Sequence, residues 1–269
     1  MGVGERNETG DGCSAIDNPN KELLRQSSIG NLTAIQFILR NCNGTDVNTV
    51  ADMHLTPLQY ASLNGHLDIV QFLLGEDGIE VNNEGKVGVT ALFIASERGS
   101  SDVVKVLLES PDIDINKGDN RTLQTALIAS TFYGHTHIVK LLLQTPGIDI
   151  NKPDREGITP LIMASSSGYI DGVRLLLQSP KVDLNKGDKN WKTALYGASR
   201  YGHSEVAKLL LQRPGIDINR DYYVSPQPTS TTVNPYTKEI KVLFCPPTPL
   251  RSFEISTRNL REVIGLGQT

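Results

Sequence analysis

Three histidines occur at equivalent positions of a repeated segment of the sequence. Histidine is the side chain most often used for proton transfer and metal binding near neutral pH. His66, His135 and His203 each follow a glycine. No HExxH pair, P-loop glycine and lysine, GxSxG or Rossmann glycine pattern accompanies them. Because all three occupy one equivalent position, the sequence predicts a structural role for them, no catalytic residues and no enzymatic activity.

The other side chains that could bind a metal or form a covalent link are scattered. His54 and His137 have no evident ligand partner, and the aspartates fall mainly in turns, where Asp accepts local backbone hydrogen bonds. Cys13, Cys42 and Cys245 are odd in number, widely spaced and without a CxxC pair, which argues against a disulfide framework and a zinc site. We therefore expect no metal, no cofactor and a reducing, intracellular setting, cytoplasmic or nuclear.

Composition narrows the classes of partner. The chain has 269 residues, of which 38% are hydrophobic and 21% charged, with a formal net charge of -4. This balance is typical of a globular protein, and no region is basic enough to favour a phosphate backbone. No apolar run approaches the roughly 20 residues that span a bilayer, and the N-terminus has no apolar signal core. We expect neither nucleic acid nor a membrane as a partner.

Three landmarks return about every 34 residues in the sequence. A threonine opens each unit after the first, a glycine follows nine residues later, and an acidic residue with asparagine two places on closes the unit. The threonines are Thr56, Thr90, Thr125, Thr159 and Thr193, the glycines are Gly30, Gly65, Gly99, Gly134, Gly168 and Gly202, and the acidic residues are Asp46, Glu80, Asp114, Asp149, Asp183 and Asp217. Six units in one register predict a repeat architecture.

Each unit reads as two short helices and a loop. A threonine hydroxyl at an N-cap accepts an orphan amide hydrogen of the first helical turn, and Pro57 and Pro160 follow where a missing N–H costs nothing. The recurring glycine suits a left-handed residue that reverses the chain. An apolar stripe such as Ile69, Val70 and Leu73 predicts the second helix. A polar, turn-rich loop then leads to the next unit.

These residues resemble the ankyrin repeats, whose unit is a projecting β-turn followed by an antiparallel helix pair with a T-P-L-H-x-A pattern. The matches are TPLQYAS at 56, TALFIAS at 90, TALIAST at 125, TPLIMAS at 159 and TALYGAS at 193. The histidine of the family pattern is replaced throughout, by Gln59, Phe93, Ile128, Ile162 and Tyr196, which changes local hydrogen bonding rather than the fold. The resemblance implies an all-α ankyrin-repeat solenoid of helical hairpins with β-turn fingers over residues 20–219.

The ends of the array are less regular than its middle. We expect a disordered segment at 1–19 and repeats that start near residues 20, 51, 85, 119, 154 and 188. The first unit lacks the threonine and begins with the polar KELLRQSS at 21, as an N-terminal cap would. Residues 220–269 read as a linker followed by either a degenerate capping unit or a free tail, because TPL recurs at 248 and Leu260, Val263 and Ile264 share a helical face.

In this family, ligands usually meet a concave face made by the finger tips and by residues late in the first helices. Carried onto this sequence, the fingers present His54, Leu123 and Trp191 where Gly88 and Gly157 show the usual glycine. Because aromatic and arginine side chains dominate binding hot spots, the candidate partner-binding residues are Phe132, Tyr133, Trp191, Arg200, Tyr201, Arg98 and Leu63. The alternative for Trp191 and Tyr133 is packing against an adjacent finger or helix.

The resemblance therefore implies a non-enzymatic scaffold or adaptor that binds a partner protein through this face. An alternative is a regulatory or targeting subunit of an enzyme supplied by a partner or by a longer product of the same gene. A third hypothesis is a docking motif in the tail, where Pro246 and Pro249 form a PxxP. Some family members are hydroxylated on asparagine in the closing turn, which makes Asn82, Asn116 and Asn151 candidates for an asparagine hydroxylase.

Overall fold

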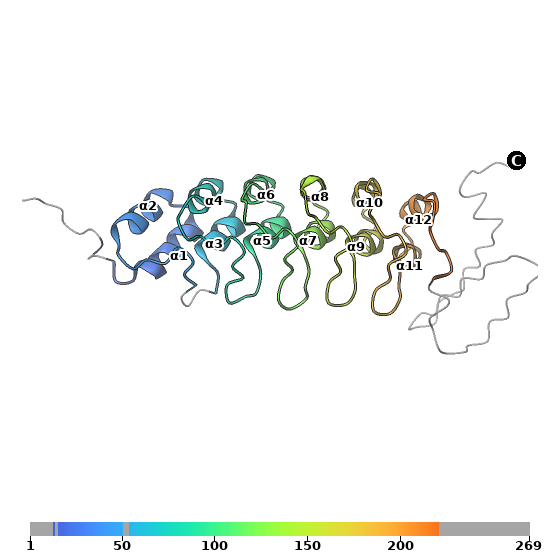
Figure 1. Ribbon diagram of the computed structural model, residues 1–269, viewed down its shortest axis with the longest axis horizontal. Helices are drawn as coiled ribbons and strands as arrows, with labels where there is room; N and C mark the ends of the chain where they lie inside the picture. Colours follow the sequence, from blue (N-terminus) through green and yellow to red (C-terminus); the bar gives the residue numbers. More distant parts are fainter. Residues whose placement is uncertain (1–12, 14–15, 51–53, 221–269) are drawn as a thin grey trace, which may run out of the picture.

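Pairs of short helices follow one another along the whole described part of the chain. The computed structural model describes residues 13, 16–50 and 54–220. Within these residues the chain forms twelve α-helices in six consecutive pairs, and no strand (Figure 1). They are α1 (Pro19–Ile29), α2 (Leu32–Asn41), α3 (Pro57–Asn64), α4 (Leu67–Leu74), α5 (Ala91–Arg98), α6 (Ser101–Leu108), α7 (Ala126–Phe132), α8 (Thr136–Gln144), α9 (Pro160–Ser166), α10 (Ile170–Leu177), α11 (Ala194–Arg200) and α12 (Ser204–Leu211). The predicted all-α repeat solenoid is confirmed.

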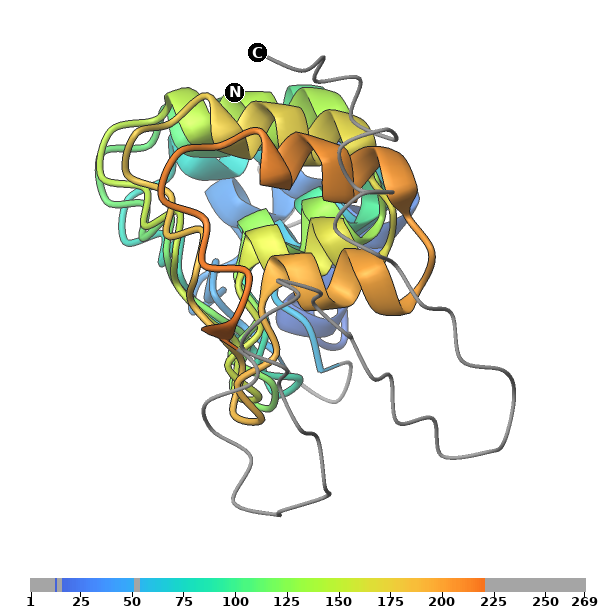
Figure 2. The same cartoon turned by 90° about the vertical axis from the view of Figure 1, so that its right-hand side faces the viewer.

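The helices form two layers, with a row of loops projecting beyond one of them (Figure 1). The odd-numbered helices pack on one another in sequence order from α1 to α11, and the even-numbered helices do so from α4 to α12. Viewed along the array, the loops of successive repeats superimpose (Figure 2). We call these loops the fingers, residues 54–55, 84–89, 118–124, 153–158 and 187–192. The finger tips and the C-terminal ends of the odd-numbered helices together make the surface that we call the finger face.

Contacts between repeats, together with those between the two helices of each repeat, bury the apolar side chains. The odd-numbered helices approach closely because a small residue stands at one repeated position, and all five of these residues are fully buried: Ala61, Ala95, Ser130, Ala164 and Ala198. Ile69, Val70 and Leu73 of α4 are also fully buried. Helices of seven or eight residues are marginal in water when isolated, so burial against the neighbouring repeats must stabilise them.

Threonine starts the first helix of every repeat from the second onward, as the sequence predicts. Each threonine hydroxyl accepts a hydrogen bond from the backbone N–H three residues later, as in Thr90 with Phe93 at 3.1 Å and Thr159 with Ile162 at 3.2 Å. The same bond occurs at Thr56, Thr125 and Thr193. An orphan donor of the first turn is satisfied in each case, which fixes where the helix begins.

The recurring histidines clamp one repeat to the one before it. The Nε2 atom of His135 donates to the carbonyl oxygen of Glu97 at 2.9 Å, and His66 and His203 make the same bond across their own repeat boundaries. The ring of His135 lies beneath Gly99, where an added Cβ would come within 2.9 Å of it. The glycine therefore supplies both a left-handed turn, with φ 78°, and room for the ring. The structural role predicted for these histidines is confirmed.

A ladder of asparagines joins the closing turns of successive repeats. The Asn116 side chain donates from Nδ2 to the carbonyl of Gly147 at 2.7 Å and accepts at Oδ1 from the N–H of Asp149 at 2.8 Å. The Asp149 carboxylate in turn accepts from the N–H of Asn151, which carries the ladder onward. Equivalent pairs of bonds start from four other asparagines, Asn48, Asn82, Asn151 and Asn185.

The N-terminal end differs from the sequence-based expectation in two respects. Cys13 and Cys42 form a disulfide, with their Cα atoms 5.4 Å apart, so the prediction of no disulfide is wrong. Asn18 caps α1, and Ile16 packs against the core, so part of the segment expected to be disordered, 1–19, has a defined place. Cys42 caps the C-terminal end of α2 and lies beside residue 13, a proximity that residue spacing along the sequence does not reveal. The cysteines therefore no longer support the prediction of a reducing, intracellular setting.

At the other end, the outer side of the sixth repeat is open among the described residues. Ile218 is 47% exposed, whereas its equivalents Ile150 and Ile115 are 5% and 6% exposed. Leu195 and Leu211 are likewise half-buried where Leu161 and Leu177 are buried in the fifth repeat. Residues 220–269, for which the sequence left a capping unit or a free tail open, lie outside the described residues, apart from Arg220.

The ladder gives a direct test of how repeats are joined. Replacing Asn116 by alanine removes two side-chain bonds to the next repeat, and we expect a loss of about 1–2 kcal/mol in the free energy of unfolding by urea. Asn219 is the matched control, because no further repeat follows it in the described residues. Equal losses for Asn116→Ala and Asn219→Ala would contradict the ladder's role between repeats.

The exposed end face predicts that the tail contributes to the stability of the sixth repeat. Removing residues 221–269 should speed amide hydrogen exchange in α11 and α12, since Leu195, Leu211 and Ile218 offer apolar surface there. Exchange in α3 and α5 is the internal control and should stay the same. Unchanged exchange in α11 and α12 would leave the tail without a capping role.

Candidate functional site

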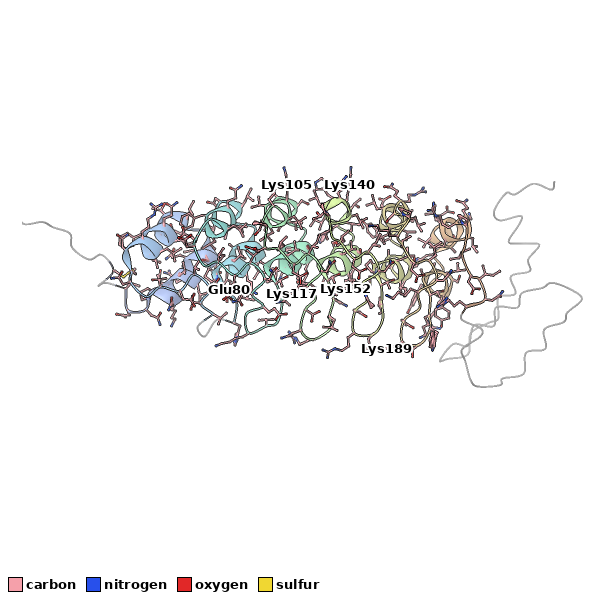
Figure 3. The ribbon with its side chains drawn as sticks, in the orientation of Figure 1. Glu80, Lys105, Lys117, Lys140, Lys152 and Lys189 are labelled. Carbon is pink, nitrogen blue, oxygen red and sulfur yellow. A yellow bond between two sulfur atoms is a disulfide. The ribbon has the colours of Figure 1, made fainter. Side chains whose placement is uncertain are left out.

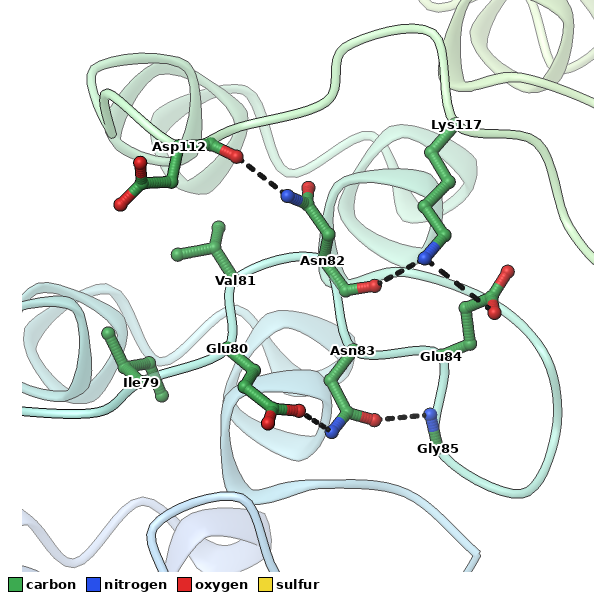
Figure 4. A pocket seen from close by; sticks show the side chains of 9 residues that line it. All are labelled: Ile79, Glu80, Val81, Asn82, Asn83, Glu84, Gly85, Asp112 and Lys117. Atoms are coloured by element: carbon green, nitrogen blue, oxygen red, sulfur yellow. Dashed lines mark hydrogen bonds and ion pairs between the residues drawn. The ribbon is translucent and has the colours of Figure 1, made fainter.

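The described residues contain an open recess of about 570 Å³ on the ladder side, between the second and third repeats (Figure 4). Its polar groups are bonded to one another rather than aimed at the recess. Asn82 donates to the carbonyl of Asp112 at 2.6 Å, and the Lys117 ammonium donates to the Asn82 carbonyl at 3.0 Å and lies 3.6 Å from Glu84. These hydrogen bonds connect the repeats on either side of the recess and leave few of its polar groups free to bind a ligand.

Neither a metal centre nor a membrane span emerges from the part of the chain that the structure describes. No group of three or more His, Cys, Asp or Glu side chains in these ranges has an arrangement that could hold a metal ion. Of the helices in the same ranges, none combines the length and the apolar character that crossing a bilayer requires. The remaining candidate is the finger face.

Backbone hydrogen bonds hold the fingers side by side. The N–H of Asn120 donates to the carbonyl of Gly88 at 2.8 Å, and the N–H of Lys189 donates to the carbonyl of Glu156 at 2.9 Å. Arg155 makes the same kind of bond to the carbonyl of Thr122 at 2.6 Å. Each finger is thus positioned by the finger before it, which gives the tips a fixed spacing.

An aspartate folds each finger of the fourth to sixth repeats into its turn. The Asp154 carboxylate accepts from the N–H groups of Glu156 and Ile158, both at 2.9 Å, and Asp188 accepts in the same way from Asn190 and Lys192. A backbone bond from the Asp N–H then closes the loop, as from Asp154 to Ile158 at 3.0 Å. Several hydrogen bonds thus fix the conformation of each turn, and together they can hold the tip residue in an unfavourable backbone conformation.

Three fingers carry a bulky residue where the backbone favours glycine. His54, Leu123 and Trp191 have φ angles of 72°, 59° and 64°, and Gly88 and Gly157 have the same left-handed conformation at the equivalent position. A left-handed conformation costs a side chain with a Cβ about 1–2 kcal/mol. All three side chains are exposed. Leu123 and Trp191 remain 45% and 50% exposed, so the strain is not offset by full burial, which motivates a functional explanation.

The ends of α7 and α11 place large side chains on the same face. Phe132, Tyr133 and Tyr201 are 54%, 50% and 60% exposed. The rings of Phe132 and Tyr133 meet edge to face with centroids 5.0 Å apart, and the guanidinium of Arg200 lies 6.0 Å from the ring centroid of Tyr201. The fifth repeat between them carries only small residues at this level, Ser166 and Ser167.

Tyr133 also makes the contact with an adjacent helix that was the alternative to binding. Its hydroxyl donates to Glu97 at 3.0 Å, and this hydrogen bond, together with partial burial and the charge of Glu97, raises the pKa of Tyr133 above its ordinary value. The bond fixes the ring while half of its surface stays exposed. Tyr133 therefore contacts the adjacent helix and still leaves half of its surface exposed for a partner.

The predicted site residues are not all gathered in one place. Phe132 with Tyr133 and Arg200 with Tyr201 form contacting pairs, and Trp191 projects from the finger that precedes α11. Leu63 is half-buried in α3, two repeats from Phe132, and Arg98 is exposed at the end of α5 between them.

Two exposed apolar positions were missed by the sequence reasoning. Ile29 is 57% exposed at the end of α1, and its place directly before Gly30 matches that of Tyr201 before Gly202, so the repeat alignment could have identified it. Phe37, 40% exposed, lines an open groove of about 1150 Å³ between α1 and α2. No repeated pattern marks that groove.

The asparagines considered for hydroxylation sit inside the ladder. The side chains of Asn82, Asn116 and Asn151 each hold both a carbonyl and an N–H of the next repeat. An enzyme acting on them would have to open that repeat boundary first. Their modification stays a prediction.

Known proteins with the same architecture match most of the chain. The family model described as "Ankyrin repeats (3 copies)" matches residues 23–119 and 126–222. The crystal structure of EF0377, an ankyrin repeat protein, is 27% identical with a TM-score of 0.65 and covers 72% of this chain and 98% of its own. The ankyrin repeat domain of Bcl-3, described as a unique member of the IkappaB protein family, is 28% identical with a TM-score of 0.67, over 76% of this chain and 89% of its own. No curated protein matches the chain.

The strain at the finger tips can be measured by comparing two substitutions at one position. Trp191→Gly and Trp191→Ala both remove the indole, but only glycine relieves the left-handed backbone. We expect the glycine variant to be about 1 kcal/mol more stable than the alanine variant in urea unfolding. The same pair of residues at position 157 should show the same order, with Gly157→Ala less stable than the wild-type protein because its Cβ would lie 2.8 Å from the backbone nitrogen of Lys189. Equal stability of the two variants at position 191 would show that the turn is not strained.

Proposed function

Because the chain belongs to the ankyrin-repeat family, whose repeats are generally protein–protein interaction modules, we propose that it is a scaffold or adaptor that binds a partner protein through its finger face. It contributes no catalytic step of its own. Binding uses a surface that is already in place before the partner arrives, since hydrogen bonds between repeats fix the spacing of fingers and helix ends. A preformed surface lowers the entropy lost on association.

The exposed aromatic side chains are the observation that favours the finger face. Exposed aromatic side chains gather on the fourth and sixth repeats of the finger face, where Phe132, Tyr133, Trp191 and Tyr201 are each half or more exposed. Buried aromatic and arginine anchors supply most of the binding energy in protein interfaces. Arg200 beside Tyr201 adds a charged group with the planar shape that such anchors use.

A partner recovered with the intact protein and then purified gives the quantitative test. Trp191→Ala and Tyr201→Ala should each weaken its affinity by about 1 kcal/mol or more, which is roughly fivefold or more. Phe37→Ala is the matched control, because it removes an exposed aromatic ring near the N-terminal end without touching the finger face. Isothermal titration provides the affinities, and circular dichroism confirms that the array stays folded. A partner that loses affinity with Phe37→Ala and not with the other two variants binds elsewhere and refutes the proposed face.

A further inference from the structure

Positive charge gathers on the same repeats that expose the aromatic rings, although the whole chain has a net charge of -4. The finger and first-helix segments of the fourth to sixth repeats, residues 117–134, 152–168 and 186–202, contain eight Lys or Arg and four Asp or Glu. The corresponding segments of the second and third repeats, 49–65 and 83–99, contain two Lys or Arg and three Asp or Glu. Among these five repeats, the excess of cations comes from the fourth and sixth, since the fifth has two of each charge.

Most of the carboxylates in these segments are occupied by the fold. Asp119 and Asp154 are buried, and with Asp188 they accept the backbone N–H groups of their own turns. Burial pushes the pKa of Asp119 upward, but hydrogen bonds from the Thr122 hydroxyl and from the N–H groups of Thr122, Gln124 and Arg121 outweigh it and leave the pKa below its ordinary value. The hydrogen bonds of the turn therefore stabilise the ionised form of Asp119, and its carboxylate points toward the backbone N–H groups of the turn rather than toward solvent.

Four of the eight cations of these segments are exposed to solvent instead. Arg121, Arg155, Lys189 and Lys192 are all exposed, and Figure 3 shows Lys189 at a finger tip. Lys189 has one carboxylate nearby, Glu156 at 3.7 Å, in a pair that is itself well exposed. Arg155 donates to the backbone carbonyl of Asn120, a bond that orients the guanidinium without cancelling its charge. Exposed pairs of this kind are weak, and among the exposed charged side chains of these fingers four cations stand against one carboxylate, Glu156.

We infer that the finger face of the fourth to sixth repeats recognises an acidic peptide segment that also carries apolar or aromatic side chains. This inference rests on the proposed function and specifies its partner. Acidic side chains of the segment would meet Arg121, Arg155, Lys189 and Lys192, and its apolar side chains would meet the rings of Phe132, Tyr133, Trp191 and Tyr201. Complementary charge would speed the encounter and exclude basic segments.

A single-stranded nucleic acid is the competing ligand, because it too combines negative charge with stacking on aromatic rings. The charge distribution favours the peptide. The ladder turns that follow each even-numbered helix carry exposed Asp114, Asp149, Asp183 and Asp217, and the net charge of the chain is negative. A polyanion with one charge per nucleotide would be repelled by the rest of the array, whereas a short acidic segment need contact only the basic part.

The test is a selection of binders from a random-peptide display library on the purified full-length protein. We expect selected peptides to be enriched in Asp and Glu together with aromatic or aliphatic residues. The variant Arg121→Gln, Arg155→Gln, Lys189→Gln, Lys192→Gln should bind the selected peptides roughly tenfold more weakly, or worse, and lose most of the salt dependence of binding. A control variant with Lys105→Gln, Lys140→Gln and Arg174→Gln loses three exposed cations, from α6, α8 and α10, and should bind as the wild type does. Figure 3 shows Lys105 and Lys140 on the side of the array opposite the finger tips.

The outcomes separate this inference from the proposed function. Peptides that depend on Trp191 and Tyr201 but show no acidic enrichment would overturn the acidic partner and leave the finger face intact. Peptides unaffected by Trp191→Ala and Tyr201→Ala would overturn both. Tighter binding of a labelled oligothymidylate than of any selected peptide, abolished by the four-site glutamine variant, would assign the basic surface to nucleic acid and refute the peptide.

Discussion

A pair of seven- or eight-residue helices cannot bury its own apolar side chains, and this constraint shapes the rest of the molecule. Leu73, Leu107 and Leu142 are fully buried only because each lies between its own repeat and its neighbours. Isolated helices of this length are marginal, so the repeats must stack, and stacking sets a fixed offset between equivalent atoms of successive units. Every hydrogen bond that crosses a repeat boundary, from the histidine clamps to the asparagine ladder and the finger bonds, exploits that offset.

Fixed stacking also separates the positions that hold the array together from those that face outward. In the fourth to sixth repeats an aspartate, a closing backbone bond and the preceding finger all constrain the finger turn, while the side chain at the tip stays exposed or, at Gly157, is absent. Such a turn can maintain Leu123 or Trp191 in a backbone conformation that glycine would adopt at lower cost. Stability supplied by the body of the array thus permits side-chain variety at the tips.

The sequence predicted the repeated features well because each depends on local chemistry. Threonine caps, left-handed glycines and small helix residues were assigned from spacing alone, and the structure has them at the same residues. The Cys13–Cys42 disulfide was not predictable in this way, because it depends on how residue 13 folds back onto the end of α2. Exposure was only partly predictable. The period locates the two positions before each glycine, but it does not indicate that Leu63 would be half-buried where Phe132 is exposed.

Departures from the repeat are informative because the repeat itself is so strongly constrained. A residue that keeps the pattern, such as His203 under Gly168, is explained by a bond that the fold needs. Trp191 departs from the glycine pattern, strains its backbone and gains no full burial, so the fold alone gives it no reason to be there. Tyr201 has an unstrained backbone, but its ring is 60% exposed where the equivalent residue of the fifth repeat is Ser167. Both departures fall on the sixth repeat, which has the largest excess of cations in its finger and first helix, and the proposed binding role would account for their exposure and for the strain at Trp191.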